Sequence, residues 1–194
     1  MSQTKVAKTV IVGDAGVGKT CLAKRAFTKN FDPHTEPTMG SEFFEGTRKM
    51  KDGTTLKFEI WDTAGQEVYR ALAPVFFKNA TIAILVFDVT KPKTLEALDY
   101  YVDALNTHTP NCFIAIVGNK IDLENDRQVT FQQGNDYAEK IKSTFYVETS
   151  ATRGDNVDQL FNMLAQVDSL KFAETAPGVV SDIGNKEDSS KKCC

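Results

Sequence analysis

The N-terminal part of the chain contains the octapeptide Gly13-Asp14-Ala15-Gly16-Val17-Gly18-Lys19-Thr20. This octapeptide matches the phosphate-binding pattern G-x-x-x-x-G-K-S/T at every fixed position. A helix-compatible run over residues 20–27 follows it. Strand, glycine-rich turn and helix in this order place the free N–H groups of a helix N-terminus against a phosphate. The preceding run predicts a buried parallel strand because it is apolar and β-branched, with Val6, Thr9, Val10, Ile11 and Val12.

Single positions of the octapeptide have separate expected roles. Gly13 and Gly18 permit the turn and the close approach of the backbone to a ligand. Lys19 would bring a cation to the β and γ phosphates, and the Thr20 hydroxyl would bind Mg²⁺. A glycine-rich turn without a ligand is the alternative, and the Lys-Thr pair in register argues against it. The other residues expected to line a nucleotide here are Asp14, Ala15, Gly16, Val17 and Cys21.

Size and composition exclude several classes of protein. The 194 residues suffice for one domain with a full core, and a net charge of −3 without a basic stripe argues against a nucleic-acid partner. No apolar run approaches the ~20 residues that cross a bilayer, and residues 1–5 resemble neither a signal peptide nor a myristoylation site. The four cysteines fit no disulfide or zinc spacing, so we expect a reducing, cytosolic compartment; they are Cys21, Cys112, Cys193 and Cys194.

Strand-like and helix-like segments alternate through the rest of the chain. Residues 42–51 and 54–60 predict a hairpin around Asp52-Gly53. The alternation indicates an α/β fold with a doubly wound, mostly parallel six-stranded sheet and helices on both faces, in which loops at the strand carboxyl ends form one site. Further strands are expected at 81–88, 113–117 and 144–147, and further helices at 91–105 with Thr94 as N-cap, at 130–141 with Thr130 as cap, and from 156 to 171 or 172.

The composition changes at about residue 173. Residues 1–172 are expected to form the nucleotide-binding domain, and residues 173–194, rich in Pro, Gly, Ser, Asp and Lys, to form a flexible tail. The tail is not a polybasic membrane patch, because its acidic residues outnumber its lysines.

Two further motifs suggest which nucleotide binds. Asp62 ends a strand expected beside the octapeptide and can hold Mg²⁺ opposite Thr20, although a turn aspartate fits equally well. In Asn119-Lys120-Ile121-Asp122, the carboxylate can accept hydrogen bonds from the N1–H and 2-amino groups of guanine, a donor pair that adenine lacks. Asn119 can tie this loop to the purine and to the phosphate loop, and the stem of Lys120 can cover the base. The motif alone is typical of a surface turn, but its place after a buried strand favours guanine.

Taken together, these motifs resemble those of the Ras-like small GTPase superfamily across about residues 6–172. The resemblance implies a P-loop NTPase fold of the small GTPase type that binds GTP or GDP with Mg²⁺, hydrolyses GTP slowly and alternates between two nucleotide states. The signature elements stand in the order of the superfamily: the phosphate loop, Thr38, Asp62-Thr63-Ala64-Gly65-Gln66, Asn119-Lys120-Ile121-Asp122 and Thr149-Ser150-Ala151.

The same resemblance implies roles for single residues. Phe31 would stack edge-on against guanine, although it equally fits a loop anchor in the core, and the Ala151 N–H would contact the guanine O6. Thr38 would reach Mg²⁺ and the γ-phosphate, the Gly65 N–H would contact the γ-phosphate, and Gln66 would orient the attacking water. The implied catalytic residues are Lys19, Thr38, Gly65 and Gln66, the implied Mg²⁺ ligands are Thr20, Thr38 and Asp62, and Ser150 completes the GTP-binding set.

Within the superfamily, several segments resemble the Rab family. Phe43, Trp61 and Phe76 match the aromatic triad through which Rab proteins present a nucleotide-dependent surface to effectors, although Trp61 alone fits ordinary sheet packing. Leu72-Ala73-Pro74 is similar to the early-endosomal Rab subgroup. Other Rab-like segments are Met39-Gly40-Ser41-Glu42-Phe43, Gln66-Glu67-Val68-Tyr69-Arg70 and Phe76-Phe77-Lys78-Asn79-Ala80.

The last two residues, Cys193 and Cys194, suit double geranylgeranylation. Two lipid chains are physically needed because one chain holds a protein only marginally, and residues 173–194 would span about 25 Å as a coil. The resemblance implies a monomer on the cytosolic face of intracellular membranes, endosomal ones included, with a cytosolic pool. Its implied partners are effectors, an exchange factor, a GTPase-activating protein, a prenylation escort and a GDP-dissociation inhibitor.

Three residues depart from the family pattern, and two alternatives remain open. Val68 replaces a basic residue, Thr152 stands where lysine is usual, and Ala15 stands where many relatives carry glycine or serine. A Ras-like signalling GTPase would need a single-cysteine C-a-a-X end. A scaffold that binds GTP without turnover is disfavoured by Gln66 and Thr38.

Overall fold

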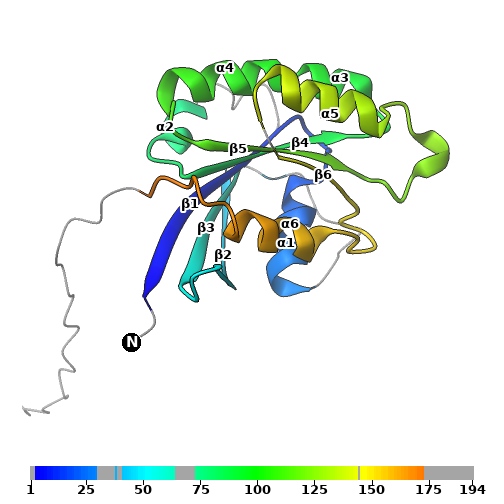
Figure 1. The fold of residues 1–194 in the computed structure, drawn as a ribbon. Coiled ribbons are helices and arrows are strands. Elements are labelled where there is room, and N and C mark those ends of the chain that lie inside the picture. The colour runs from blue at the N-terminus through cyan, green and yellow to red at the C-terminus, as the bar shows by residue number, and fades with distance from the viewer. Residues whose placement is uncertain (1–2, 30–37, 39–40, 64–72, 144, 173–194) are drawn as a thin grey trace, which may run out of the picture.

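The computed structural model describes residues 3–29, 38, 41–63, 73–143 and 145–172. These residues form a six-stranded sheet of order β2-β3-β1-β4-β5-β6, with helices on both faces (Figure 1). The pair β2–β3 is antiparallel, and the other neighbouring strands are parallel. The predicted doubly wound, mostly parallel sheet is therefore confirmed.

The elements follow each other in the predicted order, but the single helix expected at 91–105 is divided at Ala97 into two helices and extends to His108. The strands are β1 Thr4–Val12, β2 Ser41–Lys49, β3 Thr55–Thr63, β4 Ile82–Asp88, β5 Phe113–Asn119 and β6 Tyr146–Thr149. The helices are α1 Lys19–Thr28, α2 Ala73–Phe77, α3 Pro92–Glu96, α4 Leu98–His108, the 3₁₀ turn η2 Glu124–Asp126, α5 Phe131–Lys140 and α6 Val157–Ala165. Within the part of the chain that the structure describes, no helix has the length and apolar character to cross a bilayer.

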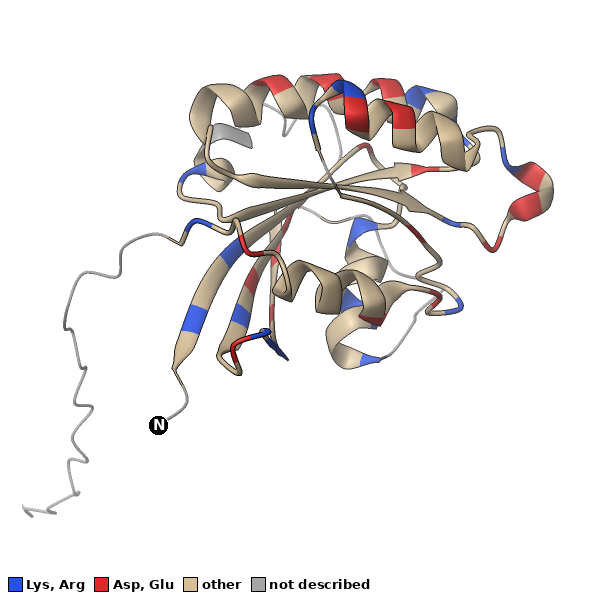
Figure 2. Cartoon of the chain, in the orientation of Figure 1, with Lys and Arg blue, Asp and Glu red and all other residues tan. Residues whose placement is uncertain are grey.

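The sheet separates two hydrophobic cores. On one face α1 and α6 cover a core in which the rings of Phe58 and Phe161 meet edge to face at 5.5 Å. On the other face α4 and α5 cover a core that contains Phe77 and Phe87. The central strand β4 is buried along its whole length, as expected for a strand covered on both sides. Figure 2 shows the charged residues mainly on the outer helices, the loops and the β2–β3 side of the sheet.

Two strand predictions need adjustment. The start of β1 extends past the helices (Figure 1), so Val6 is 39% exposed rather than buried. The predicted hairpin is confirmed, but its strands end at Lys49 and resume at Thr55, because residues 50–54 form the connection. Within it, Asp52 accepts a hydrogen bond from the Thr54 N–H at 2.8 Å.

The predicted N-cap role of Thr94 is wrong. Lys91, in an extended conformation, is the N-cap of α3, and Pro92 takes a first-turn position, where its missing N–H costs nothing. The Thr94 hydroxyl instead accepts the N–H of Asp88 at 3.0 Å and donates to the Lys91 carbonyl at 2.7 Å. Thr94 therefore joins the start of α3 to the end of β4.

The last predicted helix is too long. α6 ends at Ala165, and the next residue, Gln166, bonds back to the Met163 carbonyl in a tighter turn. The chain after it still buries Leu170 against the core, although it is no longer helical. The apolar periodicity of this stretch correctly indicated that its residues are buried, but buried residues need not be helical.

The segment around α5 follows the prediction more closely. The Thr130 cap is confirmed: its hydroxyl accepts the Gln133 N–H at 3.2 Å, while the Gln133 side chain accepts the Thr130 N–H at 2.8 Å. The last strand begins at Tyr146 and ends at Thr149, two residues later than predicted, because pairing with β5 starts at Tyr146.

Substitution of Gly134 by alanine is expected to lower the free energy of unfolding by about 1–2 kcal/mol, although alanine is the better helix former by about 1 kcal/mol. A Cβ at this position in α5 would lie 2.2 Å from the Tyr146 hydroxyl oxygen. Urea unfolding of the GDP-bound protein measures the change, and Asp136→Ala, exposed on the same helix, is the control. A Gly134→Ala protein as stable as wild type would contradict this packing.

Candidate nucleotide-binding site

The predicted motifs meet at the carboxyl end of the parallel strands. Asp62 at the end of β3 lies opposite Ile11, just before the phosphate loop. Asn119 at the end of β5 lies opposite Thr149 at the end of β6. Segments separated by more than a hundred residues therefore border one site, as the doubly wound topology requires.

The phosphate loop depends on two glycines. Gly13 has φ 143°, and a Cβ there would lie 2.1 Å from the Val86 carbonyl oxygen. Gly18 has φ 97°, and a Cβ there would lie 2.4 Å from the side-chain nitrogen of Asn119. Gly18 is also the N-cap of α1, and no described side chain caps that end. The first N–H groups of α1 are left for another acceptor, which fits a phosphate.

Lys19 is buried beside this loop. Its ammonium group donates to the carbonyl oxygens of Gly13 at 2.9 Å and Asp14 at 2.8 Å. Burial lowers the pKa of Lys19 to about 8, against the attraction of Asp62 and Asp14. A buried ammonium held by neutral carbonyls is well placed to bind an anion.

Three oxygen-bearing side chains gather at the predicted Mg²⁺ position. The Thr20 and Thr38 hydroxyls lie 2.6 Å apart, and both donate to Oδ2 of Asp62, at 2.5 and 3.3 Å. Oδ1 of Asp62 is buried and has no hydrogen-bond partner within the described residues. An orphaned buried carboxylate oxygen beside two hydroxyls fits a hard cation such as Mg²⁺. No group of three or more His, Cys, Asp or Glu side chains forms a metal cluster in the described ranges.

Mg²⁺ binding to the nucleotide-loaded protein is expected to weaken about tenfold per pH unit below pH 6. Burial raises the pKa of Asp62 to about 6, against hydrogen bonds from Thr20 and the charge of Lys19. The cation needs the ionised carboxylate, so protons compete with it below that pKa, whereas an ordinary aspartate would stay ionised to about pH 4. Fluorescence titration with Mg²⁺ between pH 5 and 8 measures this, with the affinity of free GDP subtracted. An affinity independent of pH down to 5 would contradict the prediction.

Asn119 connects the base loops to the phosphate loop. Its side-chain amide donates to the Val17 carbonyl at 2.8 Å. Its Oδ1 accepts the Thr149 hydroxyl at 3.1 Å and the Ala151 N–H at 3.2 Å. The predicted tie between Asn119 and the phosphate loop is thus present, and the Ala151 N–H, expected at the guanine O6, here donates to Asn119.

Asp122 is oriented by its neighbour across the site. The Ser150 hydroxyl donates to Oδ1 of Asp122 at 2.6 Å and itself accepts the Arg153 N–H at 3.0 Å. These two bonds hold the carboxylate, which lies on the loop after β5, against the loop that follows β6. The structure therefore gives Ser150 a positioning role.

Lys120 has a partner that the sequence analysis did not predict. Its ammonium pairs with Oδ2 of Asp88 at 2.7 Å, and its backbone has φ 73°. Burial alone would raise the pKa of Asp88, but hydrogen bonds from Lys120 and Thr90 outweigh burial and leave it lowered. The available signal was an aspartate directly after a buried strand, the same signal that singled out Asp62.

Arg127 links the loop after β5, which carries Asp122, to β6, which leads into the loop that carries Ser150. Its guanidinium binds both carboxylate oxygens of Glu148, at 2.9 and 3.0 Å, and Glu148 also accepts the Tyr146 hydroxyl at 2.8 Å. These contacts raise the pKa of Arg127, chiefly through Glu148. This pair could not be predicted from the sequence, because the two residues belong to segments that only the fold brings together.

The three predicted effector residues form one cluster. Phe43 and Trp61 lie 5.3 Å apart between ring centroids, and Trp61 and Phe76 lie 6.5 Å apart. Phe43 is 46% exposed, and Val75 beside Phe76 is 70% exposed. The cluster joins β2, β3 and α2 into an exposed apolar surface.

Several predicted residues cannot be placed. Phe31, Gly65, Gln66, Val68, Leu72, Cys193 and Cys194 lie outside the described residues. The two described cysteines, Cys21 and Cys112, are free thiols, and burial raises the pKa of Cys112 to about 12. Cys112 therefore has no thiolate character near neutral pH.

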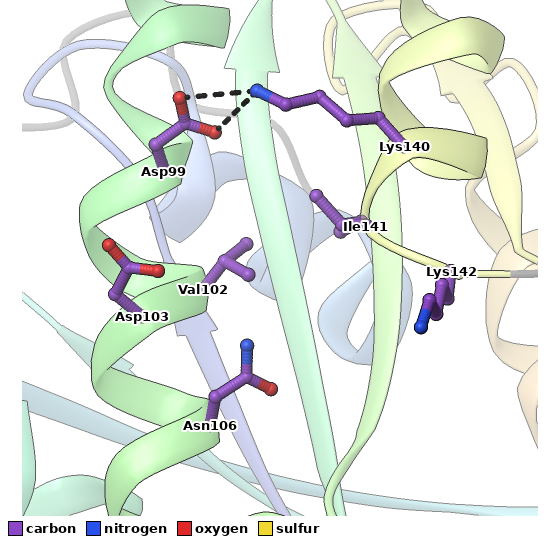
Figure 3. Close-up of a pocket in the computed structure, with 7 residues that line it drawn as sticks. All are labelled: Asp99, Val102, Asp103, Asn106, Lys140, Ile141 and Lys142. Atoms are coloured by element: carbon purple, nitrogen blue, oxygen red, sulfur yellow. Dashed lines mark hydrogen bonds and ion pairs between the residues drawn. The ribbon is translucent and has the colours of Figure 1, made fainter.

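A cavity of about 580 Å³ lies elsewhere, between α4 and the end of α5 (Figure 3). Lys140 and Asp99 face each other across it at 3.5 Å. It contains none of the predicted site residues and is separate from the nucleotide site; its lining residues are Asp99, Val102, Asp103, Asn106, Lys140, Ile141 and Lys142.

Comparison with known proteins agrees with this geometry. A family model described as the Ras family matches residues 8–169. The chain is 35% identical over 201 aligned residues to the Ras-related protein RabC of Dictyostelium discoideum, which covers 100% of both chains. It is 43% identical over 155 residues to the Ras-related protein Rab-22A of Homo sapiens, 79% of each chain. It is 39% identical over 191 residues to the Ras-related protein RABF2a of Arabidopsis thaliana, 97% of this chain and 94% of the relative.

Proposed function

The chain belongs to the Ras family and is a GTP-hydrolysing small GTPase of the Rab type that acts in vesicle trafficking, and from that premise we propose that residues 1–172 form a switch that residues 173–194 tether to a membrane. As a member of this family it binds GTP and GDP with Mg²⁺. The observation that carries the switch proposal is the position of Thr38. Its hydroxyl lies within hydrogen-bond distance of Thr20 and Asp62, so Thr38 itself reaches the predicted Mg²⁺ position.

Different residues of the site have different roles in binding and hydrolysis. Lys19 and the N–H groups at the start of α1 bind the β and γ phosphates. Thr20, Thr38 and Asp62 would hold Mg²⁺, which would neutralise charge on the phosphate oxygens. By the resemblance of Asp62-Thr63-Ala64-Gly65-Gln66 to the family motif, Gln66 orients the attacking water and the Gly65 N–H binds the γ-phosphate. The reaction is GTP + H₂O → GDP + phosphate.

The nucleotide state controls the aromatic surface through Thr38. With the γ-phosphate present, Thr38 is held at the site, and β2 begins three residues later at Ser41. When the γ-phosphate is lost, Thr38 is released, and the chain that leads from Thr38 to Phe43 is released with it. Phe43 is the exposed member of the aromatic cluster. Effectors that bind Phe43, Trp61 and Phe76 would thereby distinguish the two states.

The membrane part of the proposal rests on two adjacent cysteines, Cys193 and Cys194. Geranylgeranyl groups on Cys193 and Cys194 anchor the protein to the cytosolic face of endosomal membranes, with a cytosolic pool. An exchange factor and a GTPase-activating protein drive the cycle, and a prenylation escort and a GDP-dissociation inhibitor handle the lipidated chain. The similarity to Rab-22A and RABF2a supports this assignment.

Live imaging of the N-terminally tagged protein tests the proposal. Wild type is expected on puncta that fill early with an endocytic tracer, Gln66→Leu on enlarged puncta, and Cys193→Ser/Cys194→Ser in the cytosol. Cys112→Ser, which alters a thiol of the folded domain, is the control and should keep the wild-type pattern. A diffuse wild-type protein that the cysteine change leaves unaltered would overturn membrane anchoring. Puncta that never receive tracer would overturn the endosomal assignment.

A further inference from the structure

A second cavity, of about 310 Å³, lies where the end of α1 meets the start of α6. Three basic residues and one acidic residue line it, and none of its lining residues belongs to the predicted nucleotide site. Figure 2 shows Lys and Arg along α1 and in the loop before α6. The lining residues are Arg25, Lys29, Arg153, Gly154, Val157 and Asp158.

Arg25 is held in place by neutral groups. Its guanidinium donates to the Arg153 carbonyl at 2.9 Å and to the Lys29 carbonyl at 3.2 Å. It lies against Gly154, where φ is +87° and a Cβ would come 2.9 Å from the Arg25 Nε. A guanidinium has five N–H donors, and none of those of Arg25 meets a carboxylate within the described part of the chain. Arg25 is therefore an oriented cation with donors to spare.

The charges around the cavity do not cancel. Asp158 pairs with Lys29 and with Arg48, the latter at 3.0 Å, and Asp155 pairs with Arg153 at 2.8 Å. Arg25 brings the cations to four against these two carboxylates. The start of α6 adds its positive dipole end, and the Asn156 N-cap makes no side-chain cap bond there. Planar, multiply donating Arg side chains suit the oxygens of a phosphate.

The cavity is connected to the guanine-reading carboxylate. The Arg153 N–H donates to the Ser150 hydroxyl at 3.0 Å, and that hydroxyl donates to Asp122 at 2.6 Å. The Gly154 N–H donates to the Ser150 carbonyl at 2.7 Å. A ligand that immobilises Arg153 therefore restrains the loop that positions Asp122.

We propose that this cavity binds a phosphate-class anion between Arg25 and Arg153. The bound anion slows nucleotide release by restraining the loop after β6, whose Ser150 positions Asp122. The effect on release rests on the proposed guanine-reading role of Asp122, whereas anion binding does not. The anion is either a free phosphate or the phosphorylated headgroup of a lipid.

Binding is tested by NMR titration of the full chain, loaded with GDP and Mg²⁺, with inorganic phosphate against KCl of equal ionic strength. Saturable shifts are expected at Arg153, Gly154 and Val157 and at the Arg25 side chain. Arg25→Gln and Arg153→Gln should each weaken phosphate binding about tenfold or more. Lys93→Gln, an exposed lysine of α3 on the opposite face of the sheet, is the charge-matched control (Figure 1). Shifts that do not saturate, or that persist in Arg25→Gln, would overturn the site.

Release of a fluorescent GDP analogue tests the coupling. Saturating phosphate should slow release by about fivefold in wild type and leave the Arg25→Gln rate unchanged. Arg25→Lys, which keeps the charge but not the planar fork, should retain only part of the effect. Saturable binding with an unchanged release rate would overturn the coupling. Vesicles with phosphorylated inositol lipids, compared with neutral vesicles, assign the anion to a headgroup if the protein binds them more tightly than it binds free phosphate. GTP hydrolysis measured without phosphate shows separately whether the proposed function holds.

Discussion

Replacement of Asp122 by alanine is expected to weaken GDP and GTP binding by about 10²- to 10⁴-fold and to remove most of the preference over ATP. In the proposed site the carboxylate would accept two hydrogen bonds that only guanine can offer, each worth about 1.5–3 kcal/mol when one partner is charged. Ser150 holds Asp122 ready for these bonds at 2.6 Å, so little ordering remains to be done on binding. Association and dissociation of a fluorescent GDP analogue, with competition by GTP and ATP, measures both effects.

Two further variants separate the contribution of the Asp122 carboxylate from that of its positioning and from a general charge effect. Ser150→Ala keeps the carboxylate but removes its positioning hydrogen bond, and should weaken GDP binding about tenfold. Asp126→Ala removes an exposed carboxylate of η2, four residues along the chain, and should leave binding unchanged. An Asp122→Ala protein that still binds GDP within about threefold of wild type would mean that another residue reads the base.

Substitution of Gly18 by alanine is expected to destabilise the GDP-bound protein by about 2–5 kcal/mol. The left-handed backbone at φ 97° disfavours any side chain, and the new Cβ would lie 2.4 Å from the Asn119 side chain. Asn119 would have to move, which breaks its 2.8 Å bond to the Val17 carbonyl and leaves buried polar groups unsatisfied. Urea unfolding with saturating GDP measures the loss, which includes any weakening of nucleotide binding.

Gly16 is the matched control for this substitution. It lies in the same loop with φ 75°, but a Cβ there meets no atom within 4 Å among the described residues. Gly16→Ala should therefore add backbone strain of only about 1–2 kcal/mol. Equal losses in the two variants would show that strain alone, rather than displacement of Asn119, makes Gly18 necessary.

Features that depend on a few neighbouring residues were predictable. Three such features are specified by a few neighbouring residues, and the structure contains all of them: the phosphate loop at 13–20, the hairpin around Asp52-Gly53 and the helix cap at Thr130. The order of strands and helices, and hence the side of the sheet that carries the site, also followed from local periodicity. Boundaries were less accurate, as at α6, because burial continues after the helix ends.

Partners far apart in the chain could not be predicted. The sequence by itself determined which residue types stand at the strand ends, and so predicted a site there for a nucleotide with Mg²⁺. Only the tertiary structure decided that Lys120 pairs with Asp88 and that Arg127 pairs with Glu148. The same holds for Arg25, which donates a hydrogen bond to the carbonyl of Arg153, 128 residues away in the sequence. The physical reason is that a charged or polar side chain accepts any complementary partner, and which one lies within 3 Å depends on how the elements pack around the sheet.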